Sequence, residues 1–98
     1  MTARRLLIVE DDQALRKQLR WSLDGFTVLE AANRELALAA VRADAPQVLL
    51  LDLGLPPDAA GVSEGLATLA EVLAIAPGTK VVVMTGQEGR EHALRAIA

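Results

Sequence analysis

The sequence contains no cysteine, and this absence excludes three kinds of chemistry at once. Without thiols the chain cannot form disulfides, hold zinc through thiolates or use a cysteine nucleophile. Aromatic residues are scarce as well, since Trp21 and Phe26 are the only two. Hydrophobic residues still make up 52% of the 98 residues, so the chain can build the aliphatic core of one domain.

Concentrated positive charge and long apolar runs are also lacking. The chain has 10 Lys and Arg against 13 Asp and Glu, a net charge of -3, which argues against a nucleic-acid surface. The apolar run after Arg4 and Arg5 ends at Glu10, which is too short for a signal peptide. The run at 48–51 ends at Asp52, too short to cross a membrane. We therefore expect a cytoplasmic protein with no membrane segment and no direct nucleic-acid contact.

Short apolar runs alternate along the chain with segments of helical period. The apolar runs predict buried strands at residues 6–9, 27–31, 48–51 and 80–84. Helices are expected after caps at Asp11 or Asp12, Asn33 and Ser63, and a fourth at residues 90–97. Such alternation with short connections predicts an α/β fold, a doubly wound parallel sheet with helices on both faces.

Side-chain spacing predicts which faces of these helices turn toward the core. The residues expected to face inward are Leu36, Ala37, Ala40 and Val41 in the second helix, and Leu66, Leu69, Ala70 and Leu73 in the third. Trp21 lies near Leu15, Leu19 and Leu23 in the first helix, and we expect it to pack with them.

Acidic residues follow two of the predicted strands. In "LLIVEDD" the acids Glu10, Asp11 and Asp12 come directly after the first strand, and Asp52 ends the third. Thr85 ends the fourth strand. Because the carboxyl ends of parallel strands lie at one edge of the sheet, we expect Asp11, Asp12 and Asp52 to converge.

Two interpretations of these acids remain open. Acids that follow strands commonly cap helices, and either Asp11 or Asp12 could do so. This interpretation explains Asp52 poorly, because no helix is expected directly after it. In the second interpretation the carboxylates bind Mg²⁺, which prefers oxygen ligands.

Three motifs, "LLIVEDD", "VLLLDLGLP" and "VVVMTG", occur in this order at the ends of the first, third and fourth predicted strands. Together they resemble the receiver domain of bacterial two-component response regulators, and the resemblance covers nearly the whole chain. It implies a flavodoxin-like fold with strand order 2-1-3-4, and a module that takes a phosphoryl group from a sensor histidine kinase in the presence of Mg²⁺. The phosphorylated module would then switch an output, here expected to be transcription regulation by a downstream effector.

The resemblance also implies roles for single residues. Asp52 matches the phosphoacceptor, and Thr85 matches the switch hydroxyl that turns toward the phosphoryl group. Asp12 matches the direct Mg²⁺ ligand, and Asp11 matches the acid that holds the ion through water. Gly54 would offer its backbone carbonyl to the metal.

The chain departs from the family at its end. Receivers continue through a fifth strand, which ends in a lysine that grips the phosphoryl group, and a fifth helix. Neither has a counterpart in residues 1–98, and Lys80 precedes the fourth strand, so it cannot replace that lysine. We expect residues 1–98 to be a receiver domain that is a piece of a longer protein; a truncated receiver is the alternative. A sheet edge left open could support a homodimer or a strand-exchanged dimer.

A second departure is an insertion of about five residues in the loop 57–64, judged from the family spacing of the glycine in "EGLATL". Asp58 or Glu64 in this loop could approach the metal, or the loop could simply be solvated. The longer loop also resembles the receivers of enhancer-binding transcription regulators tied to PEP-CTERM (exosortase) sorting systems.

Two other functions remain as alternatives. An aspartyl-phosphate phosphatase also starts from an acid after a parallel strand, but it usually has a second acid two residues later, where this chain has Gly54. A pseudo-receiver would act by protein contact without phosphate. The acids argue against it, and the absent lysine argues for it.

Overall fold

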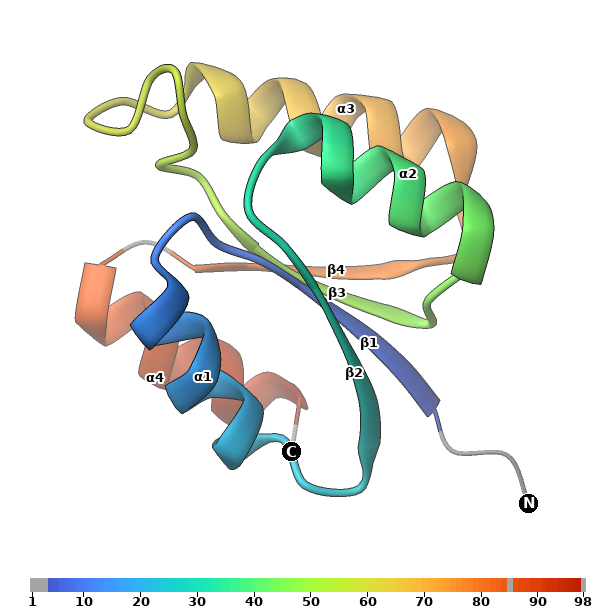
Figure 1. Cartoon of the computed structure of the whole chain (residues 1–98), viewed down its shortest axis with the longest axis vertical. Helices are drawn as coiled ribbons and strands as arrows, with labels where there is room; N and C mark the ends of the chain where they lie inside the picture. Colours follow the sequence, from blue (N-terminus) through green and yellow to red (C-terminus); the bar gives the residue numbers. More distant parts are fainter. Residues whose placement is uncertain (1–3, 85, 98) are drawn as a thin grey trace.

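The computed structural model describes residues 4–84 and 86–97, and at 86–88, 90 and 92 it describes the backbone alone. The described residues form an alternating series of strands and helices (Figure 1). In chain order these are β1 (Arg4–Val9), α1 (Gln13–Ser22), β2 (Phe26–Ala31), α2 (Arg34–Asp44), β3 (Val48–Asp52), α3 (Ser63–Ile75), β4 (Lys80–Met84) and α4 (Gly86–Ile97). Within these ranges, no helix combines the length and the apolar character needed to cross a membrane.

The strands form one parallel sheet in the order β2-β1-β3-β4. This confirms the predicted fold class and strand order. The predicted fourth strand has the observed bounds, whereas β1 begins two residues earlier than expected, at Arg4. Since β1 and β3 are neighbours in register, with Val9 beside Leu51, the residues that follow them emerge side by side.

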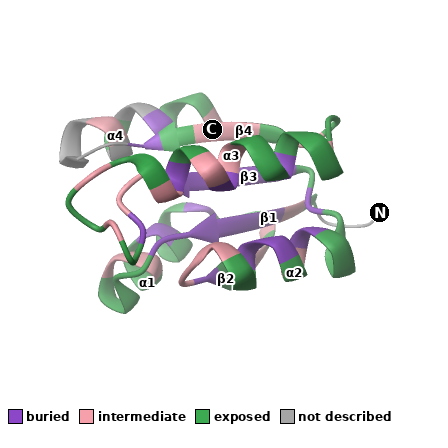
Figure 2. Ribbon diagram, turned by 90° about the horizontal axis from the view of Figure 1, so that it is seen from above, coloured by how far each residue is buried: buried purple, intermediate pink, exposed green. Residues whose placement is uncertain are grey.

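Helices cover both faces of the sheet, with α2 and α3 on one face and α1 and α4 on the other (Figure 1). The two central strands, β1 and β3, are buried along most of their length (Figure 2). Alternate residues of these strands serve the two cores: Leu7, Val9, Leu49 and Leu51 face α2 and α3, and Leu6, Ile8, Val48 and Leu50 face α1 and α4. Burial on both faces is the reason these strands are continuously apolar.

The inward face predicted for α3 is wrong. Leu66 and Leu73 are 49% and 45% exposed, and Ala70 is exposed too, so of the predicted stripe only Leu69 is partly buried. The buried residues are Gly65, Thr68 and Val72. Because α3 is apolar on most sides, spacing alone could not select the face that packs. Close contact does select it: a Cβ on Gly65 would lie 2.3 Å from the Cα of Leu53.

Two further packing predictions fail. In α2, Leu36 is 53% exposed, and Leu38 is buried instead, beside the correctly predicted Ala37 and Val41. Trp21 is 80% exposed and does not pack with its neighbours in α1. Two residues along a helix correspond to about 200° of rotation, so Trp21 points away from buried Leu19.

Candidate functional site

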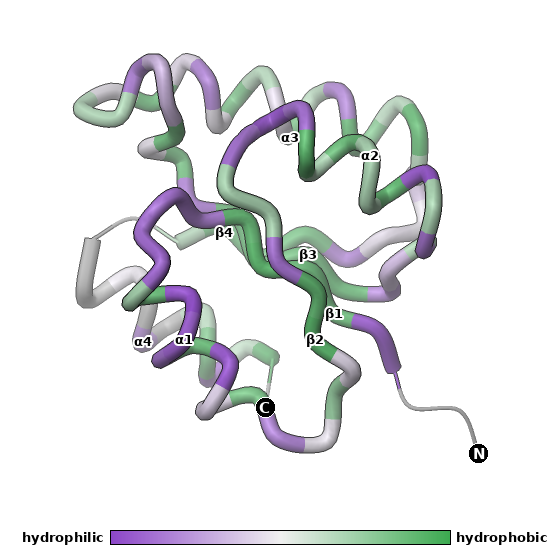
Figure 3. Tube along the Cα trace, viewed as in Figure 1, coloured by the Kyte–Doolittle hydropathy of each residue, from purple (hydrophilic) through white to green (hydrophobic). Residues whose placement is uncertain are grey.

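Three acids meet at the carboxyl edge of the sheet. Glu10 and Asp11 follow β1, and Asp52 is the last residue of the neighbouring β3. One carboxylate oxygen from each residue lies within 4.8 Å of those of the other two. Figure 3 shows hydrophilic residues directly after the hydrophobic C-terminal part of β1. The group opens into a cleft of about 680 Å³, which is also lined by residues of the loop after β3.

Glu10 is the most deeply buried of these acids, with 3% of its surface exposed. Its Oε1 accepts a hydrogen bond from the N–H of Asp12 at 3.2 Å, while its Oε2 has no partner among the described residues. Burial and the neighbouring carboxyl group of Asp52 raise the pKa of Glu10 from 4.5 to about 9. A buried, unpartnered carboxylate oxygen beside two further carboxylates is a donor set that suits a hard divalent cation.

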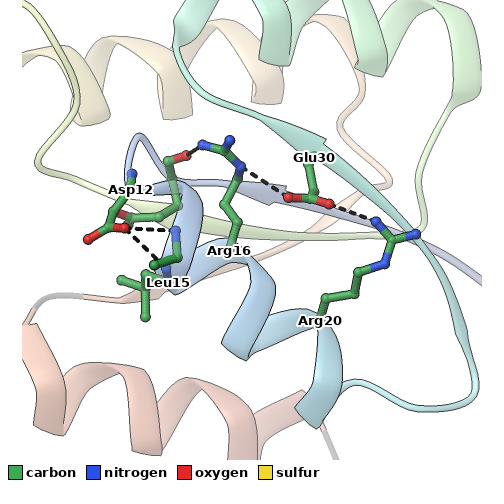
Figure 4. Close-up of polar contacts among 7 residues, drawn as sticks. Asp12, Leu15, Arg16, Arg20 and Glu30 are labelled. Atoms are coloured by element: carbon green, nitrogen blue, oxygen red, sulfur yellow. Dashed lines mark hydrogen bonds and ion pairs between the residues drawn. The ribbon is translucent and has the colours of Figure 1, made fainter.

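Asp12 does not join this group. It is the N-cap of α1, where its Oδ1 accepts hydrogen bonds from the N–H groups of Ala14 at 2.9 Å and Leu15 at 3.2 Å (Figure 4). The expected direct contact of Asp12 with the metal therefore lacks support in this geometry. The reason is the end of β1 at Val9: the next two residues place their carboxylates near Asp52, and the third is the N-cap of α1.

Glu10 is the site residue that the sequence interpretation missed. The prediction assigned the acidic metal ligands to Asp11, Asp12 and Asp52 and left Glu10 out, although Glu10 is the first acid after the strand. Its position directly after the apolar run 6–9 was a usable signal, because a charge there is costly unless a partner compensates it. The structure brings the predicted Asp11 and Asp52 together, and Glu10 takes the third position.

Asp52 and Gly54 form a tight turn at the end of β3. The N–H of Gly54 donates to Oδ1 of Asp52 at 3.2 Å, which orients the half-buried carboxylate. A Cβ on Gly54 would lie 2.7 Å from the carbonyl oxygen of Ala59, so the loop leaves no room for a side chain there. Metal binding by the carbonyl of Gly54 stays a prediction, and Thr85 lies outside the described residues.

The two acids of the inserted loop, Asp58 and Glu64, bind Ser63 and the first residue of α2, respectively. Asp58 accepts hydrogen bonds from Ser63, at 2.5 Å from the hydroxyl and 3.3 Å from the N–H, and these lower the pKa of Asp58. Ser63 is thus the first residue of α3 rather than its cap. Glu64 forms an ion pair with Arg34 at 3.0 Å. Neither acid belongs to the group of Glu10, Asp11 and Asp52, whose carboxylates lie close enough together to hold a metal ion.

Comparison with known proteins gives a consistent result. The family model described as "Response regulator receiver domain" matches residues 6–98. The chain is 32% identical over 94 residues to the C4-dicarboxylate transport transcriptional regulatory protein DctD of Rhizobium meliloti, covering 94% of this chain and 19% of the relative. It is 34% identical over 98 residues to protein-glutamate methylesterase/protein-glutamine glutaminase 3 of Rhodospirillum rubrum, covering 96% of this chain and 25% of the relative.

A solved structure shares the fold. The CheY-like response regulator receiver domain protein of Methanospirillum hungatei superposes with a TM-score of 0.78 at 29% identity, over 99% of this chain and 78% of that one. The chain spans less than half the length of the curated relatives it matches.

Proposed function

The chain belongs to the response regulator receiver domain family, and from this membership we propose that Asp52 is the phosphoacceptor of a two-component system. The observation that carries the proposal is the meeting of Glu10, Asp11 and Asp52 at the carboxyl edge of the sheet. Acids grouped in this way repel one another unless a cation or a proton compensates them.

In this proposal the site holds Mg²⁺ through Asp11 and Asp52, with Glu10 completing the acidic set and the carbonyl of Gly54 as a further ligand. The fit is supported by the all-oxygen donor set and by the unpartnered Oε2 of Glu10. When bound, Mg²⁺ neutralises charge that develops on the phosphoryl oxygens. Asp12 has a different part, which is to start α1 beside the site.

The reaction is a transfer from a phosphohistidine of a sensor histidine kinase to Asp52. A carboxylate oxygen of Asp52 forms the new bond to phosphorus, the phosphorus–nitrogen bond breaks, and the leaving imidazole keeps the electron pair and takes a proton. Asp52 is half-buried and lines the open cleft, so a phosphodonor can reach it. The short hydrogen-bonded turn to Gly54 keeps its carboxylate oriented.

Phosphorylation changes the activity of the downstream effector through the negative charge that it adds to Asp52. A phosphoryl group carries about two negative charges, and we assign Thr85 as the hydroxyl that donates a hydrogen bond to it. The effector regulates transcription in this proposal, since several relatives are named as transcriptional regulatory proteins.

The test is phosphorylation by a small phosphodonor. We expect that incubation with Mg²⁺ and acetyl phosphate adds one phosphoryl group, measured by intact mass, and that Asp52→Asn abolishes the addition. Asp58→Asn is the matched control, because Asp58 belongs to the loop that follows Asp52 yet lies outside the acidic group. An adduct on the Asp52→Asn variant would contradict the assignment, and no adduct on the unmodified chain would favour a pseudo-receiver.

A further inference from the structure

Arg16 connects α1 to the segment that carries two of the site acids. It lies at the end of the first turn of α1, and only 15% of its side chain is exposed. Its Nη1 donates to the backbone carbonyl of Glu10 at 2.6 Å, and its Nε donates to Oε1 of Glu30 at 3.1 Å (Figure 4). The side chain therefore reaches from the helix back to the end of β1.

Arg16 completes the hydrogen bonding of the Glu10 backbone. The N–H of Glu10 donates to the carbonyl of Ala31 in β2 at 3.0 Å, which fixes one side of the residue. The carbonyl of Glu10 lies past the last β1–β3 pair, Val9 with Leu51, and Arg16 is its donor. With both groups held, the peptide that joins Glu10 to Asp11 has a defined orientation.

The charge of Arg16 is balanced away from the acidic group. Glu30 accepts from Arg16 through one oxygen and from Arg20 through the other, the latter at 2.7 Å. In the described part of the chain, no ion pair joins Arg16 to Asp11 or Asp52. Arg16 thus contacts the acidic segment through a backbone carbonyl, and it does not take a metal's place as counter-ion.

We propose that Arg16 is a positioning residue for the cation site: it orients the Glu10–Asp11 peptide so that both carboxylates face Asp52 before the ion binds. The inference rests on the proposed function, because it needs the acidic group to be a Mg²⁺ site. An ordered ligand set binds more tightly, since less freedom is lost when the ion arrives.

Electrostatics alone predicts the opposite result for removing Arg16. Deleting a positive charge near an acidic site makes the local potential more negative, which should strengthen cation binding. Deleting a positioning contact should weaken it. The sign of the change in Mg²⁺ affinity therefore separates the two explanations.

The experiment measures Mg²⁺ binding by isothermal titration calorimetry in the unmodified chain and in two arginine variants. We expect Arg16→Ala to weaken Mg²⁺ binding by about 10–100-fold, the loss typical of partners that orient metal ligands. Arg20→Ala is the matched control. It removes the same charge from the same helix and also breaks an ion pair with Glu30, but it leaves the hydrogen bond from Arg16 to the Glu10 carbonyl in place. We expect its affinity to stay within about twofold of the unmodified chain.

The outcomes are distinguishable. Unchanged or tighter binding by Arg16→Ala overturns the inference, as does an equal loss in both variants. If Arg16→Ala fails to fold by circular dichroism, Arg16→Met decides: it keeps an unbranched apolar side chain but has no donor for the Glu10 carbonyl, so weaker binding supports the inference and unchanged binding overturns it. Absence of Mg²⁺ binding by the unmodified chain would instead contradict the proposed function.

Discussion

The loops that follow β1 and β3 leave the same edge of the sheet but are held in different ways. The short loop 10–12 is tied to other elements, through the N–H of Glu10 to Ala31 and through its carbonyl to Arg16. The long loop 53–62 is tied mainly to itself, for example by the N–H of Asp58 to the carbonyl of Leu55 at 2.9 Å. The comparison teaches that the acids of the site come from the short, anchored loop and from a strand end, while the long loop forms the rim of the cleft.

The largest effect is expected where the long loop meets α3. Gly65→Ala should lower the free energy of unfolding by about 3 kcal/mol, because the new Cβ would lie 2.3 Å from the Cα of Leu53 and the helix would have to move. Gly78→Ala is the control, since its Cβ would meet nothing within 4 Å in the described part of the chain. Urea denaturation measures both, and equal stabilities would show that the loop yields without cost.

The next effect concerns the short loop and pH. The pKa of Glu10 in the folded, metal-free protein is about 9, above its ordinary value of 4.5, so the folded protein keeps a proton that the unfolded chain loses. Stability should therefore fall as the pH rises from about 5 to 9. Glu10→Gln should remove this dependence and raise the free energy of unfolding at pH 8 by roughly 1–3 kcal/mol.

Urea denaturation at several pH values, with a chelator present, checks the Glu10 prediction. A Glu10→Gln variant that is less stable than the unmodified chain at pH 8 would contradict it. Added Mg²⁺ should stabilise the unmodified chain more than the variant, because ligand binding to the folded state adds stability.

The third prediction separates two adjacent acids of the short loop. Asp11→Asn should weaken Mg²⁺ binding by at least about tenfold, since even outer partners of metal ligands contribute that much. Asp12→Asn should leave binding nearly unchanged, because asparagine also caps helices well and the carboxylate of Asp12 lies outside the acidic group. Calorimetry gives both affinities. A greater loss of Mg²⁺ affinity in Asp12→Asn than in Asp11→Asn would restore Asp12 as the direct metal ligand, the assignment that was based on motif position.

The smallest effect is expected within the long loop. Asp58→Ala removes the hydrogen bonds from Ser63 at the start of α3, so the urea midpoint should fall slightly near neutral pH. Since the pKa of Asp58 is lowered in the folded protein, this contribution should disappear as the pH falls through the range where the carboxylate takes a proton. Mg²⁺ affinity should not change; a clear loss would mean that the rim takes part in the site.

The strands and their parallel arrangement were predictable because they depend on local pattern and general connection rules, whereas the strand order 2-1-3-4 came from the family resemblance. Apolar runs buried on both faces and short right-handed crossovers lead to few arrangements. The convergence of Asp11 and Asp52 followed from the same rules, because both follow neighbouring parallel strands. The packed face of α3 was not predictable, since alanine, valine, leucine and isoleucine residues together make most sides of the helix apolar.

The sequence by itself determined a parallel α/β sheet with acids at the carboxyl ends of its central strands, because the apolar periods and the positions of charge are properties of the chain alone. Only the tertiary structure decided that Glu10 and Asp11, rather than Asp12, meet Asp52. The physical reason lies in where β1 ends: the two residues after Val9 place their carboxylates near Asp52, and the third accepts hydrogen bonds from the N–H groups of α1. A sequence motif gives only the order of the acids along the chain; the end of β1, the cap of α1 and the pairing of β1 with β3 determine where each carboxylate lies.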